Sequence, residues 1–290
     1  MNKNKEVKQI DISDLHCGGT TAVFPNYPMS FKDGEKNARN HTPTPIQKLI
    51  YNHVMTVASN IKARREKSRF IVNVNGDSIE GFHHNTIQVV STNPVHHVEI
   101  HNEVMDNFLE RIGFSVKLGD ELNYIVGTES HTGWLERKIA EHFETFGATF
   151  ADERQDVING RLVWHTHQGR GVGSGANEGD GYRNWLKNTY FDCEKEKINK
   201  PDLIVSSHFH KSLYQTYVRD WHTIHGIVTP SLQVKTKHGL RVAPFIKEDI
   251  GLTVTTITEG GDMRFERPYL LEKELIKKAI KETNDLVGFE

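Results

Sequence analysis

Five short apolar segments of this chain each lead into a pair of acidic or histidine side chains, and this repeated pattern restricts the fold more than any other feature. The segments read as buried strands, at 7–13, 69–77, 121–131, 157–169 and 200–210. Apolar residues at helical spacing fill the intervals, at 46–67, 94–117, 134–146 and 182–198. Strands that alternate with helices in this way predict an α/β fold with a largely parallel sheet.

The paired side chains follow the strands and avoid the helix interiors. They are Asp14 with His16, Asp77 with Glu80, Glu129 with His131, His165 with His167, and His208 with His210. Ligands of open α/β sheets bind beyond the carboxyl ends of the strands, so we expect the five pairs to converge on one site. Imidazoles and carboxylates together suit divalent Mn, Fe, Co, Ni or Zn. One such pair is ordinarily a packing feature, but five at strand ends predict a metal site.

Length and composition are typical of one cytoplasmic domain. The 290 residues allow a single core, which we expect over about 7–260, followed by a C-terminal helix at about 271–285. The only cysteines, Cys17 and Cys193, favour a reducing cytoplasm. The formal net charge of −2 gives no support for non-specific nucleic-acid binding. No run of 18 apolar residues occurs, so we expect no membrane association.

Two segments, 17–45 and 81–120, are longer than a minimal core of this kind requires. The first is rich in Gly, Pro and Asn, which predicts a long loop. We expect both segments to shape the substrate cleft.

The order of the five pairs resembles the motifs of the calcineurin-like metallophosphoesterases. That family carries D-x-H, G-D-x-x-[DE], G-N-H-[DE], a strand-end histidine and G-H-x-H, and this chain offers DLH (14–16), GDSIE (76–80), GTESH (127–131), HTHQG (165–169) and SHFH (207–210). The resemblance covers residues 7 to about 235. The longer stretches NGDSIEGFHH and TPSLQVKT are similar to the branch of the family found in bacteriophages, and for a phage-encoded chain the expected cytoplasm is that of the host. The resemblance implies a layered α/β sandwich with mixed β-sheets flanked by helices.

The resemblance also implies a site for two divalent metal ions, with Mn favoured and Fe, Zn, Co or Ni as alternatives. Asp14, His16 and His210 would bind the first ion. Asp77 would bridge both ions, because a carboxylate offers two oxygens. His208 would bind the second ion together with a histidine of HTHQG.

For that last ligand, His167 is favoured over His165. His167 lies where the strand gives way to Gly169, as the corresponding ligand of the family does. His165 points to the same face of the strand and is the alternative ligand or a support for the site.

The third motif departs from the family pattern. In the family its Asn binds the second ion and the following His lies close to the leaving group, whereas here Gly127 is followed by Thr128, Glu129, Ser130 and His131. We expect Glu129 to replace the Asn as a metal ligand, with Thr128 as the alternative. We expect His131 to be the general acid that protonates the leaving group.

Four further side chains are candidates for supporting roles. Glu80 fits the Asp/Glu position of the family that supports the site without binding metal. Arg170, in the glycine-rich stretch after HTHQG, is a candidate for holding a phosphate oxygen, with a solvated loop position as the alternative. His83 and His84 follow the strand of the bridging aspartate and are candidates for substrate contact or for surface positions.

The resemblance implies an enzyme that hydrolyses phosphomonoesters or phosphodiesters, with a nucleotide or nucleic acid as the favoured substrate. Two metal ions lower the pKa of a bridging water, and the resulting hydroxide attacks phosphorus. One alternative is a non-catalytic, metal-bearing scaffold that binds a partner, since GTESH differs from the family motif. A second is a metal-dependent amide hydrolase, which also uses histidine-rich strand ends but generally lacks the G-D-x-x-[DE] strand.

Overall fold

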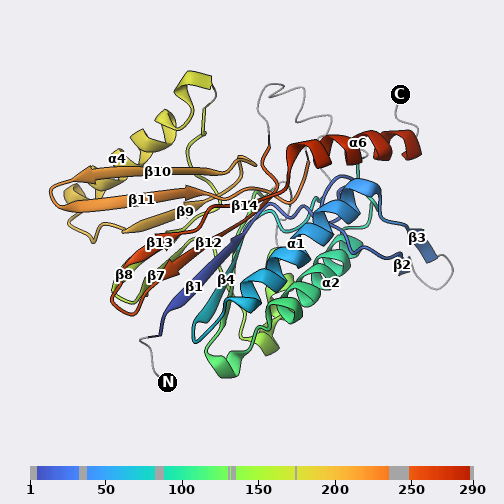
Figure 1. The fold of residues 1–290 in the computed structure, drawn as a ribbon, viewed down its shortest axis with the longest axis horizontal. Coiled ribbons are helices and arrows are strands. Elements are labelled where there is room, and N and C mark those ends of the chain that lie inside the picture. The colour runs from blue at the N-terminus through green and yellow to red at the C-terminus, as the bar shows by residue number, and fades with distance from the viewer. Residues whose placement is uncertain are drawn as a thin grey trace.

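Two mixed β-sheets pack face to face, and helices cover the outer face of each sheet (Figure 1). The computed structural model describes residues 5–32, 38–81, 88–129, 131, 135–173, 175–234 and 248–287. The layered α/β sandwich with mixed sheets confirms the fold expected from the sequence.

The larger sheet has seven strands in the order β13-β12-β1-β4-β5-β6, with β14 paired to β12. Four of them are parallel: β1 (Val7–Ile12), β4 (Arg69–Asn75), β5 (Glu121–Ile125) and β6 (Thr149–Ala151). Three C-terminal strands are antiparallel to their neighbours: β12 (Gly251–Ile257), β13 (Met263–Phe265) and β14 (Tyr269–Leu270). The parallel half matches the alternation of strands and helices in the sequence.

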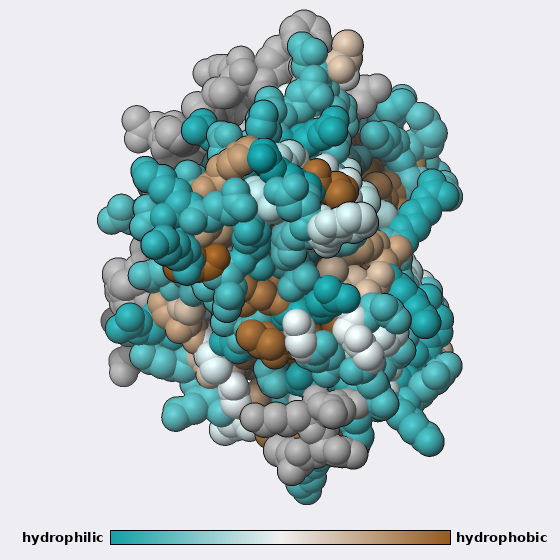
Figure 2. Space-filling view, turned by 90° about the vertical axis from the view of Figure 1, so that its left-hand side faces the viewer, coloured by the Kyte–Doolittle hydropathy of each residue, from teal (hydrophilic) through white to brown (hydrophobic). Residues whose placement is uncertain are grey.

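The smaller sheet has five strands in the order β10-β11-β9-β8-β7. Its two outer pairs are antiparallel hairpins, β7 (Arg154–Ile158) with β8 (Arg161–His165) and β10 (Leu213–Arg219) with β11 (His222–Val228). The central strand β9 (Leu203–Ser206) is parallel to both of its neighbours. On the face of the molecule in Figure 2, apolar residues form separate areas among hydrophilic ones.

Helices α1 (Pro45–Ala63) and α2 (Pro94–Ile112) pack on the outer face of the larger sheet (Figure 1). Thr44 and Gln47 form a reciprocal capping box at the start of α1, which satisfies backbone N–H groups that have no partner within the helix. Helix α2 ends where Gly113 takes a left-handed conformation (φ 70°). Two shorter helices, α3 (Leu135–His142) and α6 (Lys273–Val287), complete this layer.

Helix α4 (Asp180–Glu196) covers the outer face of the smaller sheet. Its Tyr182, Leu186 and Tyr190 are buried against Ile204 and Ile224 of that sheet. Three 3₁₀ turns lie elsewhere, at Val116–Leu118, Glu144–Phe146 and Gly175–Asn177. A separate apolar cluster joins the two sheets, and it lies at the end of β1 away from Asp14.

Three expectations about the elements need correction. The predicted loop at 17–45 contains a small hairpin, β2 (Met29–Lys32) and β3 (Ala38–His41). The helix predicted to reach 117 stops at Ile112, because Gly113 ends it. The strand predicted over 121–131 stops at Ile125, so GTESH lies in a loop. None of the helices in the described ranges combines the length and the apolar character needed to cross a bilayer.

Candidate metal centre

The loops that follow β1 and β4 run side by side and form the floor of the site. The two strands are parallel neighbours, with Ile12 opposite Val74. Beyond them the pairing continues, because Asp14 N donates to Gly76 O at 3.1 Å and His16 N donates to Asp77 O at 2.9 Å. The first two predicted motifs therefore meet because their strands are adjacent.

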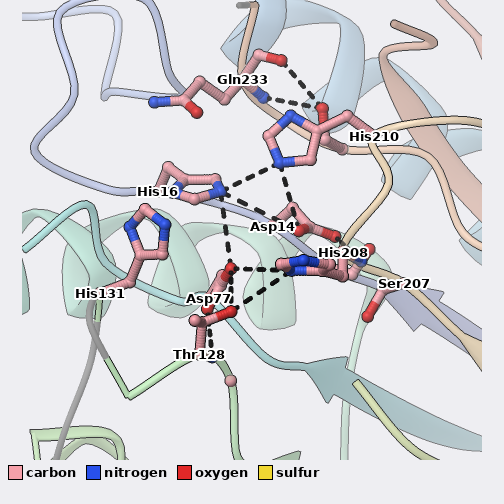
Figure 3. A network of polar contacts seen from close by, with 12 residues as sticks. Asp14, His16, Asp77, Thr128, His131, Ser207, His208, His210 and Gln233 are labelled. Atoms are coloured by element: carbon pink, nitrogen blue, oxygen red, sulfur yellow. Dashed lines mark hydrogen bonds and ion pairs between the residues drawn. The ribbon is translucent and has the colours of Figure 1, made fainter. Parts of the chain in front are cut away.

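Five of the predicted metal ligands have a left-handed backbone, which is uncommon for residues other than glycine. Their φ angles are 48° for Asp14, 46° for His16, 49° for Asp77, 75° for His208 and 51° for His210. Such conformations cost roughly 1–3 kcal/mol each and gather at functional sites. In this backbone conformation the side chains point toward one another (Figure 3).

Asp14, His16 and His210 form the first group of donors able to hold a metal ion. His210 Nε2 lies 3.3 Å from Asp14 Oδ1 and 3.2 Å from His16 Nε2. His16 Nε2 lies 3.9 Å from the same Asp14 oxygen. The two ligands of the DLH motif and the last ligand of the SHFH motif are thus brought together from opposite sheets.

Asp77, His167 and His208 form the second group. Asp77 Oδ2 lies 3.1 Å from His167 Nε2 and 4.0 Å from His208 Nδ1. The same oxygen lies 4.0 Å from His16 Nε2 of the first group. Asp77 therefore lies close to donors of both groups. It is the residue that the motif resemblance predicts as a bridging carboxylate.

Two polar residues stand behind His16. Glu80 Oε2 lies 3.1 Å from His16 Nδ1, and Gln233 Nε2 donates to the same carboxylate oxygen at 2.5 Å. A carboxylate on one ring nitrogen fixes the tautomer and leaves the other nitrogen as the metal ligand. Glu80 therefore lies between His16 and Gln233, and Gln233 belongs to the TPSLQVKT stretch.

His131 lies beside the first group. Its ring packs edge-on against that of His16, with the centroids 4.7 Å apart (Figure 3). Its Nδ1 lies 2.9 Å from the Glu80 carbonyl oxygen. Nδ1 therefore carries the proton donated to that carbonyl. His131, Glu80 and His16 also form a third group of mutually close donors.

Of the two histidines in HTHQG, the structure brings His167 to the other ligands. His167 Nδ1 lies 2.8 Å from the Asn75 carbonyl oxygen and 2.9 Å from Ser207 Oγ, so its Nε2 is the nitrogen that faces Asp77. His165 is buried lower in the sandwich, where its Nε2 lies 3.3 Å from Asp11 Oδ1. His165 belongs to the polar contacts between the sheets.

In the third motif, Thr128 lies at the centre and Glu129 does not. Thr128 N donates to Asp77 Oδ1 at 2.6 Å, and Thr128 Oγ1 lies 3.2 Å from Asp77 Oδ2. Glu129 is exposed and belongs to none of the donor groups found among the described residues. The expectation that Glu129 replaces the Asn ligand is therefore not supported, because the loop turns that side chain outward and its neighbour inward.

Glu136 is a buried residue beside this site that belongs to none of the five sequence motifs. Its carboxylate accepts from Ser78 N at 3.0 Å and from Gly127 N at 2.6 Å, so it ties the Asp77 loop to the Thr128 loop. Nothing in one sequence marks this residue, since it looks like an ordinary acid near the start of a short helix. Ser207 and Gln233 likewise carry no signal of their own.

The buried charges stabilise one another. Burial alone would raise the pKa of Asp77, but the hydrogen bond and charge of His167 hold the pKa of that carboxyl well below its usual range. Burial opposes protonation of His167, yet its bond to Asp77 raises the pKa of His167 to about 10. Desolvation likewise opposes ionisation of Asp14, and the neighbouring His210 outweighs it, so the pKa of Asp14 is lowered. Both carboxylates are ionised at neutral pH, as metal ligands must be.

The donor set fits divalent cations. Asp14 Oδ1 is fully buried and accepts no well-directed hydrogen bond in the described part of the chain. The facing ring nitrogens of His16 and His210 leave at least one lone pair directed at the other ring. A cation between such lone pairs would satisfy groups that are otherwise costly to bury. Carboxylate and imidazole donors are those that Mn, Fe, Co, Ni and Zn prefer.

The remaining candidates lie outside this cluster or outside the described residues. Arg170 is exposed and belongs to none of the donor groups found among the described residues. His83 and His84 fall within 82–87, outside the described residues.

Comparisons with solved structures give distant similarities. No family model matches the sequence, and no curated protein matches it. Among solved structures, an archaeal phosphodiesterase aligns with 91% of this chain and 99% of its own, at 10% identity and a TM-score of 0.41. The sulfate thiohydrolase SoxB of Thermus thermophilus aligns with 97% of this chain and 61% of its own, at 12% identity and a TM-score of 0.40. A 5'-nucleotidase of Candida albicans aligns over 98% and 59%, at 11% identity and a TM-score of 0.31.

Proposed function

We propose that this protein is a dimetal-dependent hydrolase of phosphomonoesters or phosphodiesters, of the calcineurin-like type. The observation that carries the proposal is that Asp77 Oδ2, a donor of the second group, also lies 4.0 Å from His16 Nε2 of the first group. The order of the motifs that supply these donors supports it independently.

Two bound cations would supply a water of lowered pKa as the nucleophile and would polarise the phosphoryl oxygens. The first would be held by Asp14, His16 and His210, and the second by His167 and His208, with Asp77 shared. Glu80 orients the His16 ring through Nδ1.

His131 is the proton donor to the leaving oxygen in this proposal. Its Nδ1–H is engaged by the Glu80 carbonyl, so Nε2 is the atom that holds the transferable proton. His131 lies beside the first donor group, with its ring against that of His16, and is not one of the three donors of that group.

A nucleotide or nucleic acid is the proposed substrate class, on the resemblance of NGDSIEGFHH to phage members of the family.

We further propose one domain in a reducing cytoplasm. The buried free thiols of Cys17 and Cys193 support the choice of compartment.

The second candidate is a metal-bearing scaffold without activity. The observation that favours it is the third motif, where Thr128 stands in place of the family's Asn. The histidine of this motif, His131, follows Thr128 by three positions, whereas in the family it directly follows the Asn. An amide hydrolase is less favoured, because the shared Asp77 follows a G-D-x-x-[DE] strand.

Hydrolysis of bis-p-nitrophenyl phosphate in the presence of Mn²⁺ tests the proposal. We expect turnover by the wild type and its loss, by a factor of about 1,000 or more, in Asp77→Asn, because the amide loses the anionic oxygen that both groups share. The exposed Asp262→Asn, in the turn between β12 and β13, is the matched control and should keep full activity. Binding of two Mn²⁺ per chain with no turnover on mono- or diesters would instead establish the scaffold.

A further inference from the structure

The hydroxyl of Thr128 faces the space between the three donors of the second group, which belong to Asp77, His167 and His208. We propose that Thr128 Oγ1 is the fourth donor to the second cation. The family motif has an asparagine as the ligand at this position and not a threonine. The inference rests on the proposed function only in assuming that a second cation binds between Asp77, His167 and His208.

The distances among the four atoms carry the inference. Thr128 Oγ1 lies 3.2 Å from Asp77 Oδ2, 3.4 Å from His167 Nε2 and 3.3 Å from His208 Nδ1. Asp77 Oδ2 lies 3.1 Å and 4.0 Å from the same two nitrogens. Four tetrahedral donors about 2.0–2.2 Å from one centre stand roughly 3.3–3.6 Å apart. The hydroxyl therefore completes a set of the right size.

The backbone holds Thr128 in this place. Thr128 N donates to Asp77 Oδ1 at 2.6 Å, and Gly127 N donates to the buried Glu136 carboxylate at 2.6 Å. A Cβ on Gly127 would stand 2.2 Å from Asp77 N, so only glycine lets the two loops approach this closely. The hydroxyl is thus fixed before any cation arrives, which lowers the entropic cost of binding.

A hydroxyl suits this position chemically. It has two lone pairs and one proton, so one lone pair can bind a cation while the hydroxyl keeps its proton. Unlike the carboxylate of Glu129, it adds no negative charge, and Asp77 remains the anion of the second group. A neutral oxygen donor favours a hard cation such as Mn²⁺ over a soft one.

The first test replaces the hydroxyl by a thiol and uses Cd²⁺ as the probe. In Thr128→Cys, a thiol inside the coordination sphere loses its proton to buffer and binds Cd²⁺ as thiolate, which gives a thiolate-to-cadmium absorption band in the ultraviolet. We expect this band at one equivalent per chain. The wild type, whose two cysteines are buried, is the control and should show none. A folded Thr128→Cys that binds two Cd²⁺ without the band would overturn the inference.

The second test measures Mn²⁺ binding by titration calorimetry, without substrate. Thr128→Val keeps the shape and the backbone bond to Asp77, and we expect its second cation to bind about tenfold or more weakly. Thr128→Ser restores the oxygen and should recover near-wild-type affinity, while Thr223→Val on β11 controls for the same change elsewhere. Unchanged affinity in Thr128→Val, or a single bound cation in the wild type, would refute the fourth-donor role. A protein that binds two cations through Thr128 but hydrolyses no phosphoester would refute only the proposed function.

Discussion

His131 is the residue whose chemical role can be separated from metal binding. Its ring contacts His16, but its Nδ1 is committed to the Glu80 carbonyl. In His131→Gln we expect hydrolysis of an alkyl phosphodiester to fall about 100-fold or more, because an alkoxide needs a proton in order to leave. Hydrolysis of bis-p-nitrophenyl phosphate should fall much less, since p-nitrophenolate leaves unprotonated.

The control for this variant is the number of Mn²⁺ ions bound, which should stay at the wild-type value. Equal losses on both substrates, or loss of a bound cation, would show that His131 acts as a ligand and not as an acid.

His101, in helix α2, should make stability depend on pH. It is fully buried in α2 beside Tyr124 and Phe143, and its Nε2 has no hydrogen-bond partner in the described part of the chain. Burial lowers the pKa of His101 to about 3, the hydrogen bond to Asn102 opposes this shift, and the nearby His142 adds a smaller lowering effect. The unfolded chain therefore binds a proton below about pH 6.5 that the native chain does not, so stability falls as the pH falls from 6.5 toward 3.

Urea unfolding at pH 7 and pH 5 measures this effect. Between these pH values we expect His101→Leu to lose about 2 kcal/mol less of its free energy of unfolding than the wild type does. Equal losses in the two proteins would mean that His101 does not contribute to acid sensitivity.

The identity of most candidate ligands is visible in the sequence, because each follows a strand whose apolar pattern is clear. Asp14, Asp77 and His210 are examples. The choice of Thr128 over Glu129 is not visible, since it depends on which way one loop residue turns. Glu136 is not visible either, because its partners are backbone N–H groups of residues 9 and 58 positions away.

At the scale of elements, the short helix α3 matters through its first turn. Glu136 joins two loops by accepting two backbone hydrogen bonds while fully buried. In Glu136→Ala both N–H groups lose their acceptor, which should cost about 2–4 kcal/mol of the free energy of unfolding. Glu136→Gln keeps one acceptor oxygen and should cost less.

Chemical denaturation of the metal-free protein measures this difference, so that loss of cation binding does not contribute. Glu141→Ala, an exposed position on the same helix, should change stability by no more than about 0.5 kcal/mol. A similar small change in Glu136→Ala would show that the loops hold without the carboxylate.

The strands and long helices follow from periodicity, but their ends do not. The apolar spacing predicts a helix at 46–67, which gives the start of α1 (Pro45–Ala63) to within one residue and places its end too late. It misses β10 and the hairpin of β2 with β3, whose residues lack a continuous apolar run. These strands form because a partner strand lies alongside, which no local pattern reveals.

At the scale of the whole molecule, the site joins the two sheets. Asp14, His16 and Asp77 follow strands of the larger sheet, whereas His167, His208 and His210 follow strands of the smaller one. Cations bound between them should therefore stabilise the docking of one sheet on the other. At a concentration 100 times the dissociation constant, each bound ion adds about 2.7 kcal/mol.

We expect Mn²⁺ to raise the melting temperature by about 5 °C or more above its value in a chelator. Calorimetric melting of the wild type with and without EDTA measures the shift, and Asp77→Asn should abolish most of it. Identical melting of the wild type in Mn²⁺ and in EDTA would contradict a site that links the sheets.

The strand order of the larger sheet also bears on how the protein is made. β1 lies between β4 and β12, so the strand that carries Asp14 has one edge unpaired until β12 leaves the ribosome. At about 5–20 residues per second, the interval from Ile12 to Ile257 lasts roughly 10–50 s. During synthesis the nascent chain therefore exposes an open sheet edge, and the set of candidate ligands is complete only once His210 has been added.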